Sequence, residues 1–313
     1  MADPKVPAAE EGPTRCGTIA LMGAPNAGKS TLLNALVGSK VSIVSPKPQT
    51  TRTRITGIAM AERAQLIFLD VPGVFSPKRT MERAMVAAAW SGAADADVVV
   101  VLVDARRQPD VPGDDTAMII DHLKHKNRKA ILVLNKVDLV PRPTLLAKAS
   151  AMTQPGSPFT DVFMISALTG SGVDDLRKHL AKISPDGPWL YPPDQLADIQ
   201  ERFLAAEITR EKLFIALHDE LPHALTVETE RWEEKKDGSV RVEQRVIVTR
   251  DSQKPIILGA GGARIKAIGM ASRKELEVIF GRPVHLFLQV SVDKDWAETP
   301  RHLRAMGLEA PRR

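Results

Sequence analysis

The chain has 313 residues, of which 43% are hydrophobic and 26% charged, and its net charge is +5 at neutral pH. This length suits two domains of about 150 residues each, and the composition excludes a fibrous or largely disordered chain. The single cysteine, Cys16, excludes an internal disulfide and indicates a reducing compartment. No apolar run approaches the about 20 residues of a membrane-spanning helix, so we expect a cytoplasmic protein. The positive charge favours a polyanionic partner without identifying it.

The first half of the chain alternates strands and helices. Residues 1–15 lack an apolar block, and we expect a disordered tail there. Residues 16–184 form the first expected domain, with apolar strands at 18–22, 65–69, 98–103, 130–134 and 162–165. Continuous apolar strands separated by helices predict an α/β fold, a mostly parallel sheet with helices on both faces. Such sheets bind ligands beyond the carboxyl ends of their strands.

The first expected strand leads into a complete phosphate-binding loop. Its glycines let backbone N–H groups converge on phosphate oxygens at the positive end of the next helix. Lys29 is expected to reach the β- and γ-phosphates of a nucleotide, and the Ser30 hydroxyl to bind Mg²⁺. The expected phosphate-binding residues are Gly23, Ala24, Pro25, Asn26, Ala27, Gly28, Lys29, Ser30 and Thr31.

Residues 45–52 read Ser-Pro-Lys-Pro-Gln-Thr-Thr-Arg, which is polar, basic and interrupted by proline. We expect a switch segment that becomes ordered when the γ-phosphate of a nucleotide is present and relaxes after hydrolysis. Thr50 or Thr51 would close on Mg²⁺ in the ordered state, and the sequence does not choose between them.

A second switch segment follows the strand at 65–69. Asp70 fits a carboxylate on the Mg²⁺ side of the site, acting through water, and Gly73 lets the backbone approach the γ-phosphate. The segment consists of Asp70, Val71, Pro72 and Gly73.

Two later segments identify the base as guanine. Asp138 can accept hydrogen bonds from the ring N1–H and the 2-amino group together, which adenine cannot offer, so ATP should be strongly rejected. Asn135 and Lys136 would contact the base and brace the phosphate loop. The backbone N–H of Ala167, between Ser166 and Leu168, is the expected donor to the guanine O6 atom.

The second half has a different rhythm. Turn-rich residues 185–195 read as a linker, and residues 196–313 as a second domain with a C-terminal tail. The pattern predicts an amphipathic helix, two strands joined by a charged hairpin, a glycine loop, a helix and a last strand. These elements are expected at 195–220, 224–229, 240–249, 259–262, 263–280 and 284–292. This domain is therefore α+β.

The glycine loop suggests nucleic-acid binding. A Gly-x-x-Gly loop lets a polynucleotide backbone approach closely because no Cβ intervenes. The apolar segment before it and the helix and strand after it favour a type II KH domain over a simple turn. Eight basic residues against three acidic ones between 245 and 282 agree with an RNA ligand. The expected RNA-binding residues are Gly259, Ala260, Gly261, Gly262, Arg264 and Lys266.

The phosphate loop, the Gln-Thr-Thr-Arg segment and the glycine loop together resemble the Era family of bacterial GTPases over roughly residues 17–308. The resemblance implies slow GTP hydrolysis with Mg²⁺, and binding to small-subunit ribosomal RNA near its 3′ end during assembly of the small ribosomal subunit. Many GTPases have a glutamine at the position of Val74, where it orients the attacking water. The resemblance implies a hydrophobic residue there instead, as is usual in this family. Some relatives hold K⁺ with the asparagine that matches Asn26. The second variable position of the glycine loop is often basic in related proteins, whereas it is Gly261 in this chain.

Two other functions compete with this interpretation. A GTPase of the tRNA-modification type would carry a different amino-terminal domain and a cysteine near its end, and this chain has neither. A membrane-surface protein would bind through the basic helix at 263–280, which contains Glu275 and Glu277 and no tryptophan. The resemblance also implies a monomer with weak association to the cytoplasmic face of the inner membrane, beside its binding to the pre-ribosomal small subunit.

Overall fold

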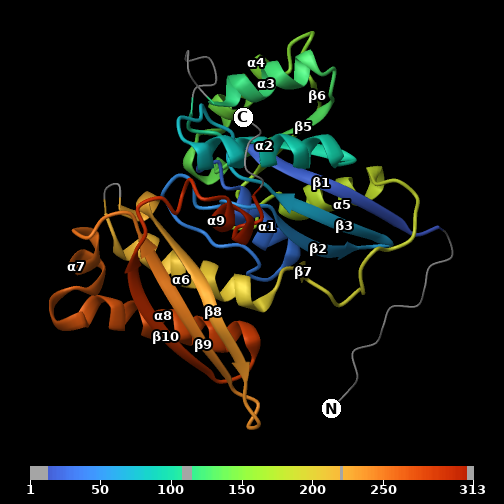
Figure 1. Cartoon of the computed structure of the whole chain (residues 1–313). Helices are drawn as coiled ribbons and strands as arrows, with labels where there is room; N and C mark the ends of the chain where they lie inside the picture. The colour runs from blue at the N-terminus through green and yellow to red at the C-terminus, as the bar shows by residue number, and fades with distance from the viewer. Residues whose placement is uncertain (1–12, 108–114, 219–220, 309–313) are drawn as a thin grey trace.

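The computed structural model describes residues 13–107, 115–218 and 221–308. Two domains pack against each other, with the first at the upper right of Figure 1 and the second, in orange and red, at the lower left. Most of the expected N-terminal tail and the last five residues lie outside the described residues.

A seven-stranded sheet forms the centre of the first domain, in the order β6-β5-β4-β1-β3-β2-β7. β3, β1, β4, β5 and β6 pair in parallel, as expected from their continuous apolar sequences. The strands are β1 (Arg15–Gly23), β2 (Ile55–Ala61), β3 (Ala64–Asp70), β4 (Val98–Asp104), β5 (Ala130–Asn135), β6 (Phe159–Ile165) and β7 (Ala197–Asp198).

Helices cover both faces of this sheet, which confirms the predicted α/β fold. Leu32 of α1 and Leu176 of α5 belong to the apolar core on one face. Ala89 of α2, Ile119 of α3 and Met152 of α4 belong to the core on the other. The helices are α1 (Lys29–Val37), α2 (Thr80–Asp95), α3 (Asp115–His125), α4 (Arg142–Met152) and α5 (Val173–Ile183), with a short 3-10 turn η1 (Val137–Leu139) after β5.

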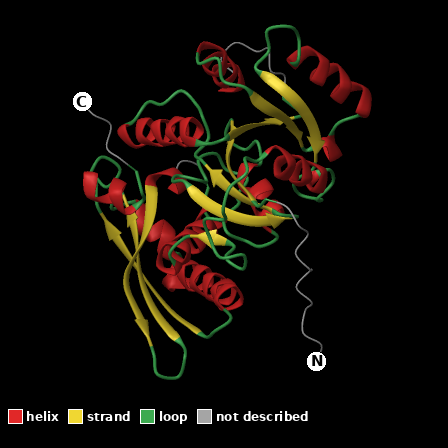
Figure 2. Cartoon of the chain, turned by 90° about the vertical axis from the view of Figure 1, so that its right-hand side faces the viewer, coloured by secondary structure: helices red, strands yellow, loops and turns green. Residues whose placement is uncertain are grey.

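The second domain has a three-stranded sheet in the order β10-β9-β8, with β9 antiparallel to β8 and parallel to β10. Helices pack on one face of the three strands (Figure 2). This is the element order expected of a type II KH domain. The elements are α6 (Glu201–Ala216), η2 (Leu221–Ala224), β8 (Leu225–Glu234), β9 (Val240–Val248), α7 (Gln253–Leu258), η3 (Ala260–Gly262), α8 (Ala263–Phe280), β10 (Val284–Val292) and α9 (Pro300–Ala305).

Two strands were absent from the sequence prediction. β2 pairs antiparallel with β3 through a tight turn in which Glu62 takes a positive φ of 53°. β7 pairs antiparallel with β2, and the N–H of Ile58 also donates to the Leu196 carbonyl at 2.8 Å. Residues 196–198 therefore extend the sheet of the first domain, although we expected the second domain to begin at 196.

The helix that we expected from 195 to 220 is also shorter. It begins at Glu201, because residues 196–198 are held in extended conformation by the edge of the sheet. It ends at Ala216, and Leu217 is already extended at φ −107° and ψ 160°.

The C-terminal segment joins the two domains. Trp296, Leu303 and Leu308 are buried against Met81 and Met85 of α2, and Ile247 of β9 belongs to the same cluster. The Trp296 indole N–H also donates to the Ala224 carbonyl at 3.3 Å. α2 of the first domain and β9 of the second therefore share one apolar cluster.

Candidate functional site

The phosphate loop lies between β1 and α1, at the carboxyl edge of the parallel strands. Gly28 has φ 100°, and a Cβ there would lie 2.2 Å from the Asn135 amide nitrogen, so only glycine fits. The ammonium group of Lys29 is buried and donates to the carbonyls of Gly23 and Ala24 at 3.0 and 3.1 Å. Burial lowers the pKa of Lys29 to about 8, although the nearby Asp70 opposes the shift.

The hydroxyl groups of the expected metal site surround one carboxylate, that of Asp70. Asp70 is fully buried, and its Oδ2 atom accepts from Ser30 at 2.6 Å and from Ser42 at 2.9 Å. The Thr51 hydroxyl lies 2.7 Å from the Ser30 hydroxyl and 3.3 Å from the same Oδ2 atom. Burial raises the pKa of Asp70, while these hydroxyls and Lys29 oppose the shift.

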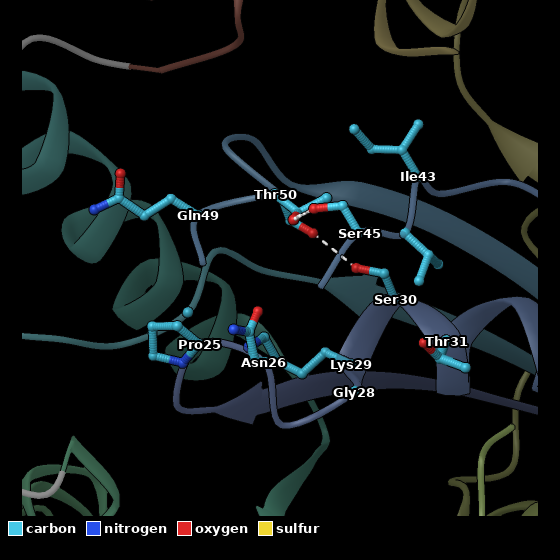
Figure 3. Close-up of a pocket in the computed structure, with 13 residues that line it drawn as sticks. Pro25, Asn26, Gly28, Lys29, Ser30, Thr31, Ile43, Ser45, Gln49 and Thr50 are labelled. Carbon is cyan, nitrogen blue, oxygen red and sulfur yellow. Dashed lines mark hydrogen bonds between the residues drawn. The ribbon is translucent and has the colours of Figure 1, made fainter. Parts of the chain in front are cut away.

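The structure distinguishes the two threonines that the sequence left open. Thr51 is buried beside Ser30, whereas the Thr50 hydroxyl lies 2.6 Å from the Ser45 hydroxyl and 2.7 Å from the Lys47 carbonyl (Figure 3). Only Thr51 is therefore brought to the hydroxyl groups around Asp70.

The second switch segment runs directly beneath the phosphate loop. A Cβ at Gly73 would lie 3.0 Å from the Pro25 nitrogen, so glycine permits the close approach of the two segments. Val71 and Pro72 are buried between Asp70 and this glycine. Val74 is fully buried, and its N–H donates to the Gly23 carbonyl at 3.2 Å. The side chain at this position therefore belongs to the core and cannot orient a water molecule.

Asn135 ties three nucleotide-binding segments together. Its amide nitrogen donates to the Ala27 carbonyl at 2.8 Å, and its oxygen accepts from the N–H groups of Lys136 and Ala167. Lys136, at φ 66°, donates through its ammonium group to the Asn26 carbonyl at 2.6 Å and to Asp104 at 2.7 Å. These contacts brace the phosphate loop as the sequence predicts. The N–H of Ala167 is paired with Asn135, and its assignment to guanine O6 stays a prediction.

Asp104, at the end of β4, was not singled out from the sequence. Burial raises its pKa, but hydrogen bonds from Arg106 and Lys136 outweigh burial and hold the pKa well below its usual value. Its carboxylate therefore stays charged and fixes Lys136. The sequence could have predicted Asp104 as a site residue, because it ends an apolar strand in the same way as Asp70. Ser42 gave no such signal, since nothing in its neighbouring sequence predicts a contact with Asp70.

Asp138 lies beside a hollow of about 490 Å³ at the end of β5 and β6. Its carboxylate is exposed, and Ser166, which lines the same hollow, is buried. Leu168 is 82% exposed and does not line this hollow. Because the Asp138 carboxylate is exposed in this structure, it is accessible to a guanine base.

The glycine loop connects α7 to α8. Gly259, Gly261 and Gly262 all have positive φ, at 72°, 55° and 78°, and a Cβ at Gly259 would lie 2.8 Å from the Arg264 Cβ. Ala260 lies in the same 3-10 turn. Arg264 is exposed, and its guanidinium donates to the Ile256 carbonyl at the end of α7.

Behind the loop, Ile257 and Ile268 are buried in the core, whereas Ile256 is 49% exposed. Lys266 is exposed on the first turns of α8. The loop therefore offers a bare backbone flanked by two cations, which is suited to a nucleic-acid strand.

Fold and site together define a P-loop protein with guanine-selective segments, joined to a KH domain. A family model described as a 50S ribosome-binding GTPase matches residues 18–136, and a KH domain model matches residues 220–297. Among the described residues, no helix is long and apolar enough to cross a membrane, and no group of three or more His, Cys, Asp or Glu side chains could hold a metal.

Relatives that match nearly the whole chain are named GTPase Era. GTPase Era of Bradyrhizobium sp. (strain ORS 278) is 57% identical over 97% of this chain and 98% of its own length. GTPase Era of Sinorhizobium medicae is 56% identical over 96% of each chain. The crystal structure of an Aquifex aeolicus Era variant bound to GDP and AlF4− has a TM-score of 0.88, with 38% identity over 94% of this chain and 99% of that one.

A structure of Era in complex with MgGDPNP and nucleotides 1506–1542 of 16S ribosomal RNA gives the same TM-score, identity and coverage. The chain belongs to the GTPase Era family, and its activity is the hydrolysis of GTP.

We expect Asp138→Asn to weaken GTP binding by about 30-fold to 1000-fold, because an amide cannot accept from both the N1–H and the 2-amino group, a loss of roughly 2–4 kcal/mol. Competition titrations with a fluorescent GTP analogue would measure the change. Asp121→Asn, an exposed carboxylate on α3, is the matched control and should bind GTP normally. Equal GTP affinity in both variants would contradict the assignment of Asp138 to the base.

Proposed function

We propose that the protein is a GTP-dependent switch that binds single-stranded small-subunit ribosomal RNA near its 3′ end and acts in assembly of the small ribosomal subunit. The observation that carries this proposal is the bare glycine loop between α7 and α8, flanked by Arg264 and Lys266. The similar Era structure with MgGDPNP and 16S ribosomal RNA supports the same ligands. Such a partner would place the protein in the cytoplasm.

The residues around Asp70 fit Mg²⁺. The Oδ1 atom of Asp70 is buried without a hydrogen-bond partner, although Oδ2 has three. A hard cation prefers such carboxylate and hydroxyl oxygens. Ser30 and Thr51 would hold the ion, with Asp70 acting through water. When bound, Mg²⁺ neutralises charge on the β- and γ-phosphates.

The chain's own residues position GTP for attack by water. Backbone N–H groups of the phosphate loop and the ammonium group of Lys29 would bind the phosphates, and Lys29 would exchange its bonds to Gly23 and Ala24 for phosphate oxygens. Val74 contributes no polar group to the attacking water. Intrinsic turnover should therefore be slow without a partner.

Asn26 suits a K⁺ ligand beside the phosphates. Its backbone is left-handed at φ 64°, and its amide nitrogen donates to the Pro46 carbonyl at 3.0 Å. Asn26 is exposed, so a cation can reach its amide oxygen. Hydrolysis should be several-fold faster in KCl than in NaCl, and Asn26→Ala should remove the difference. Equal rates in the two salts for the unaltered chain would refute a K⁺ site.

The first switch segment is bound to helix α6 of the KH domain. The N–H of Val44 donates to Glu211 at 2.8 Å, and Arg210 donates to the Thr50 carbonyl at 2.5 Å. The ammonium group of Lys47 donates to the carbonyls of Phe214 and Leu217 at the end of α6. A change in this segment must therefore alter contacts of the KH domain.

Arg52, also in the first switch segment, is buried against the KH domain. It is 2% exposed and donates to the carbonyls of Leu225 at 2.7 Å and Pro222 at 3.2 Å. Its guanidinium carbon lies 5.5 Å from the Phe214 ring centre and 5.6 Å from that of Trp296. Burial lowers the pKa of Arg52 to about 9, and the nearby Arg210 adds to the shift. Because Thr51 precedes Arg52, the position of the expected Mg²⁺ ligand depends on the KH domain.

To test RNA binding, we would combine Gly259→Asp with Gly262→Asp. Two negative charges at the glycine loop should abolish binding of a single-stranded RNA from the 3′ region of 16S ribosomal RNA, because the loop can no longer approach phosphate. GTP hydrolysis should be unchanged, since these positions lie outside the nucleotide site. Gel-shift and phosphate-release assays would measure the two activities. Unchanged RNA affinity in this variant would refute the proposed groove.

To test coupling, we would measure RNA affinity with GDPNP and with GDP. We expect about fivefold to 100-fold tighter binding with GDPNP, the usual range for coupling between two sites. Arg52→Met keeps much of the side-chain volume but loses the bonds to three carbonyls, and it should make the two affinities equal. Arg54→Met, an exposed arginine two residues later, is the control and should keep the difference. Equal affinities in the unaltered chain would refute the coupling.

A further inference from the structure

A hollow of about 650 Å³ lies between the two domains, and neither the phosphate loop nor the glycine loop contributes to its lining, although Gln49 lines both this hollow and the phosphate-loop pocket. We call it the interdomain hollow. Five segments line it: the first switch at Pro48 and Gln49, the start of α2, the end of η2, the region between β9 and α7, and the C-terminal segment at Trp296. A second hollow of about 570 Å³ shares Arg79, Thr249 and Arg250 with it and extends to Lys294.

The rim of the interdomain hollow is basic. Lys78, Arg79, Arg250 and Lys294 are exposed, and within the described part of the chain none of them forms an ion pair. By contrast, Arg231, Arg241 and Arg282 of the second domain form ion pairs with Glu233, Glu243 and Glu201. The cations at this rim are therefore free to bind an anion.

Two acids also line these hollows, and one is already engaged. Glu82 accepts the backbone N–H groups of Lys78 and Arg79 at 2.7 and 3.1 Å, which fixes the first turn of α2. Asp251 follows Arg250 in the second hollow. Four cations against two acids leave the rim positive, and the cations come from both domains. An extended polyanion would therefore contact both domains at once.

We propose that the interdomain hollow binds backbone phosphates of the same RNA whose single-stranded part lies in the glycine-loop groove. This inference rests on the proposed RNA-binding function. α7 separates the two places, and its six residues span only about 9 Å. Arg250 lies just before α7, and Gly259 lies just after it. An RNA strand can cover this distance within a few nucleotides.

The lining favours RNA over a membrane surface. The large apolar side chains at the hollow, Met81 and Trp296, are buried, so neither of them projects for insertion into lipid. Hydrogen-bonding side chains of Gln49, Thr249 and Gln253 face the space instead. Polar groups beside cations suit the sugar and phosphate groups of RNA.

RNA in this hollow would also report on the nucleotide. Gln49 precedes Thr51 by two residues. Lys78 and Arg79 lie between the second switch segment and the start of α2, where they line the hollow together with residues of the KH domain. When either switch moves, the cations and polar groups of the hollow move relative to Arg250. The site therefore offers a second route from GTP hydrolysis to RNA release, besides the contact at Arg52.

The test uses the full chain and two RNAs from the 3′ region of 16S ribosomal RNA. One has about four nucleotides, the length that a glycine loop holds, and the other about 20. Binding is measured at several KCl concentrations for the unaltered chain and for Arg79→Gln/Lys294→Gln. For the longer RNA, the variant should lower the slope of log affinity against log salt by about 1.4, because each lost phosphate contact removes about 0.7. For the short RNA, slope and affinity should not change.

Lys124→Gln/Lys126→Gln, two exposed cations near the end of α3, removes the same charge elsewhere and should leave both slopes unchanged. GTP hydrolysis and the melting temperature would show that each variant is folded. If Arg79→Gln/Lys294→Gln does not fold, Arg250→Gln serves instead, with an expected slope change of about 0.7.

An unchanged slope for the longer RNA overturns the inference. So does a variant that loses binding to anionic phosphatidylglycerol vesicles but keeps its RNA slope, because the rim would then serve a membrane. Failure of the unaltered chain to bind either RNA would instead refute the proposed RNA-binding function.

Discussion

One buried oxygen atom organises the nucleotide site. Oδ2 of Asp70 accepts hydrogen bonds from Ser30 of the phosphate loop, from Ser42 and from Thr51 of the first switch. A buried carboxylate needs such partners, because an uncompensated charge in the core is very costly. The three segments are thus held around one charge, which links the switch to the phosphate loop. The other carboxylate oxygen remains unpaired in the core, and this imbalance is what makes a cation a fitting ligand.

Much of the fold and site could be predicted because chain order and chemistry agreed. The phosphate loop and the segments that begin at Asp70, Asn135 and Ser166 each follow or end an apolar strand, and parallel strands bring their carboxyl ends to the same edge. Asn135 and Lys136 therefore meet the phosphate loop in the structure as they were expected to do. The KH domain was predictable for a similar reason. Helix α8 and strand β10 follow from periodicity, and the glycine loop before them has a distinctive spacing.

What could not be predicted depends on contacts between distant residues. β7 has two residues, too few for any periodicity, and it exists because β2 offers an open edge. The choice of Thr51 over Thr50 depends on the direction in which the switch enters the core, which neighbouring residues do not determine. Arg52 lies in a polar, basic segment that the sequence predicts to be exposed, yet it is buried because it packs against the rings of Phe214 and Trp296.

The burial of Arg52 means that neither domain has a complete interior of its own. Without the second domain, a guanidinium and the carbonyl groups it satisfies would be separated and exposed to water. Without the first, the rings of Phe214 and Trp296 would lose their contact with this cation. A gene fragment that encodes either half would therefore yield a weakened protein, and selection should keep the two halves in one reading frame. Because Arg52 of the first domain is buried among residues of the second, substitutions in the two domains should be constrained together.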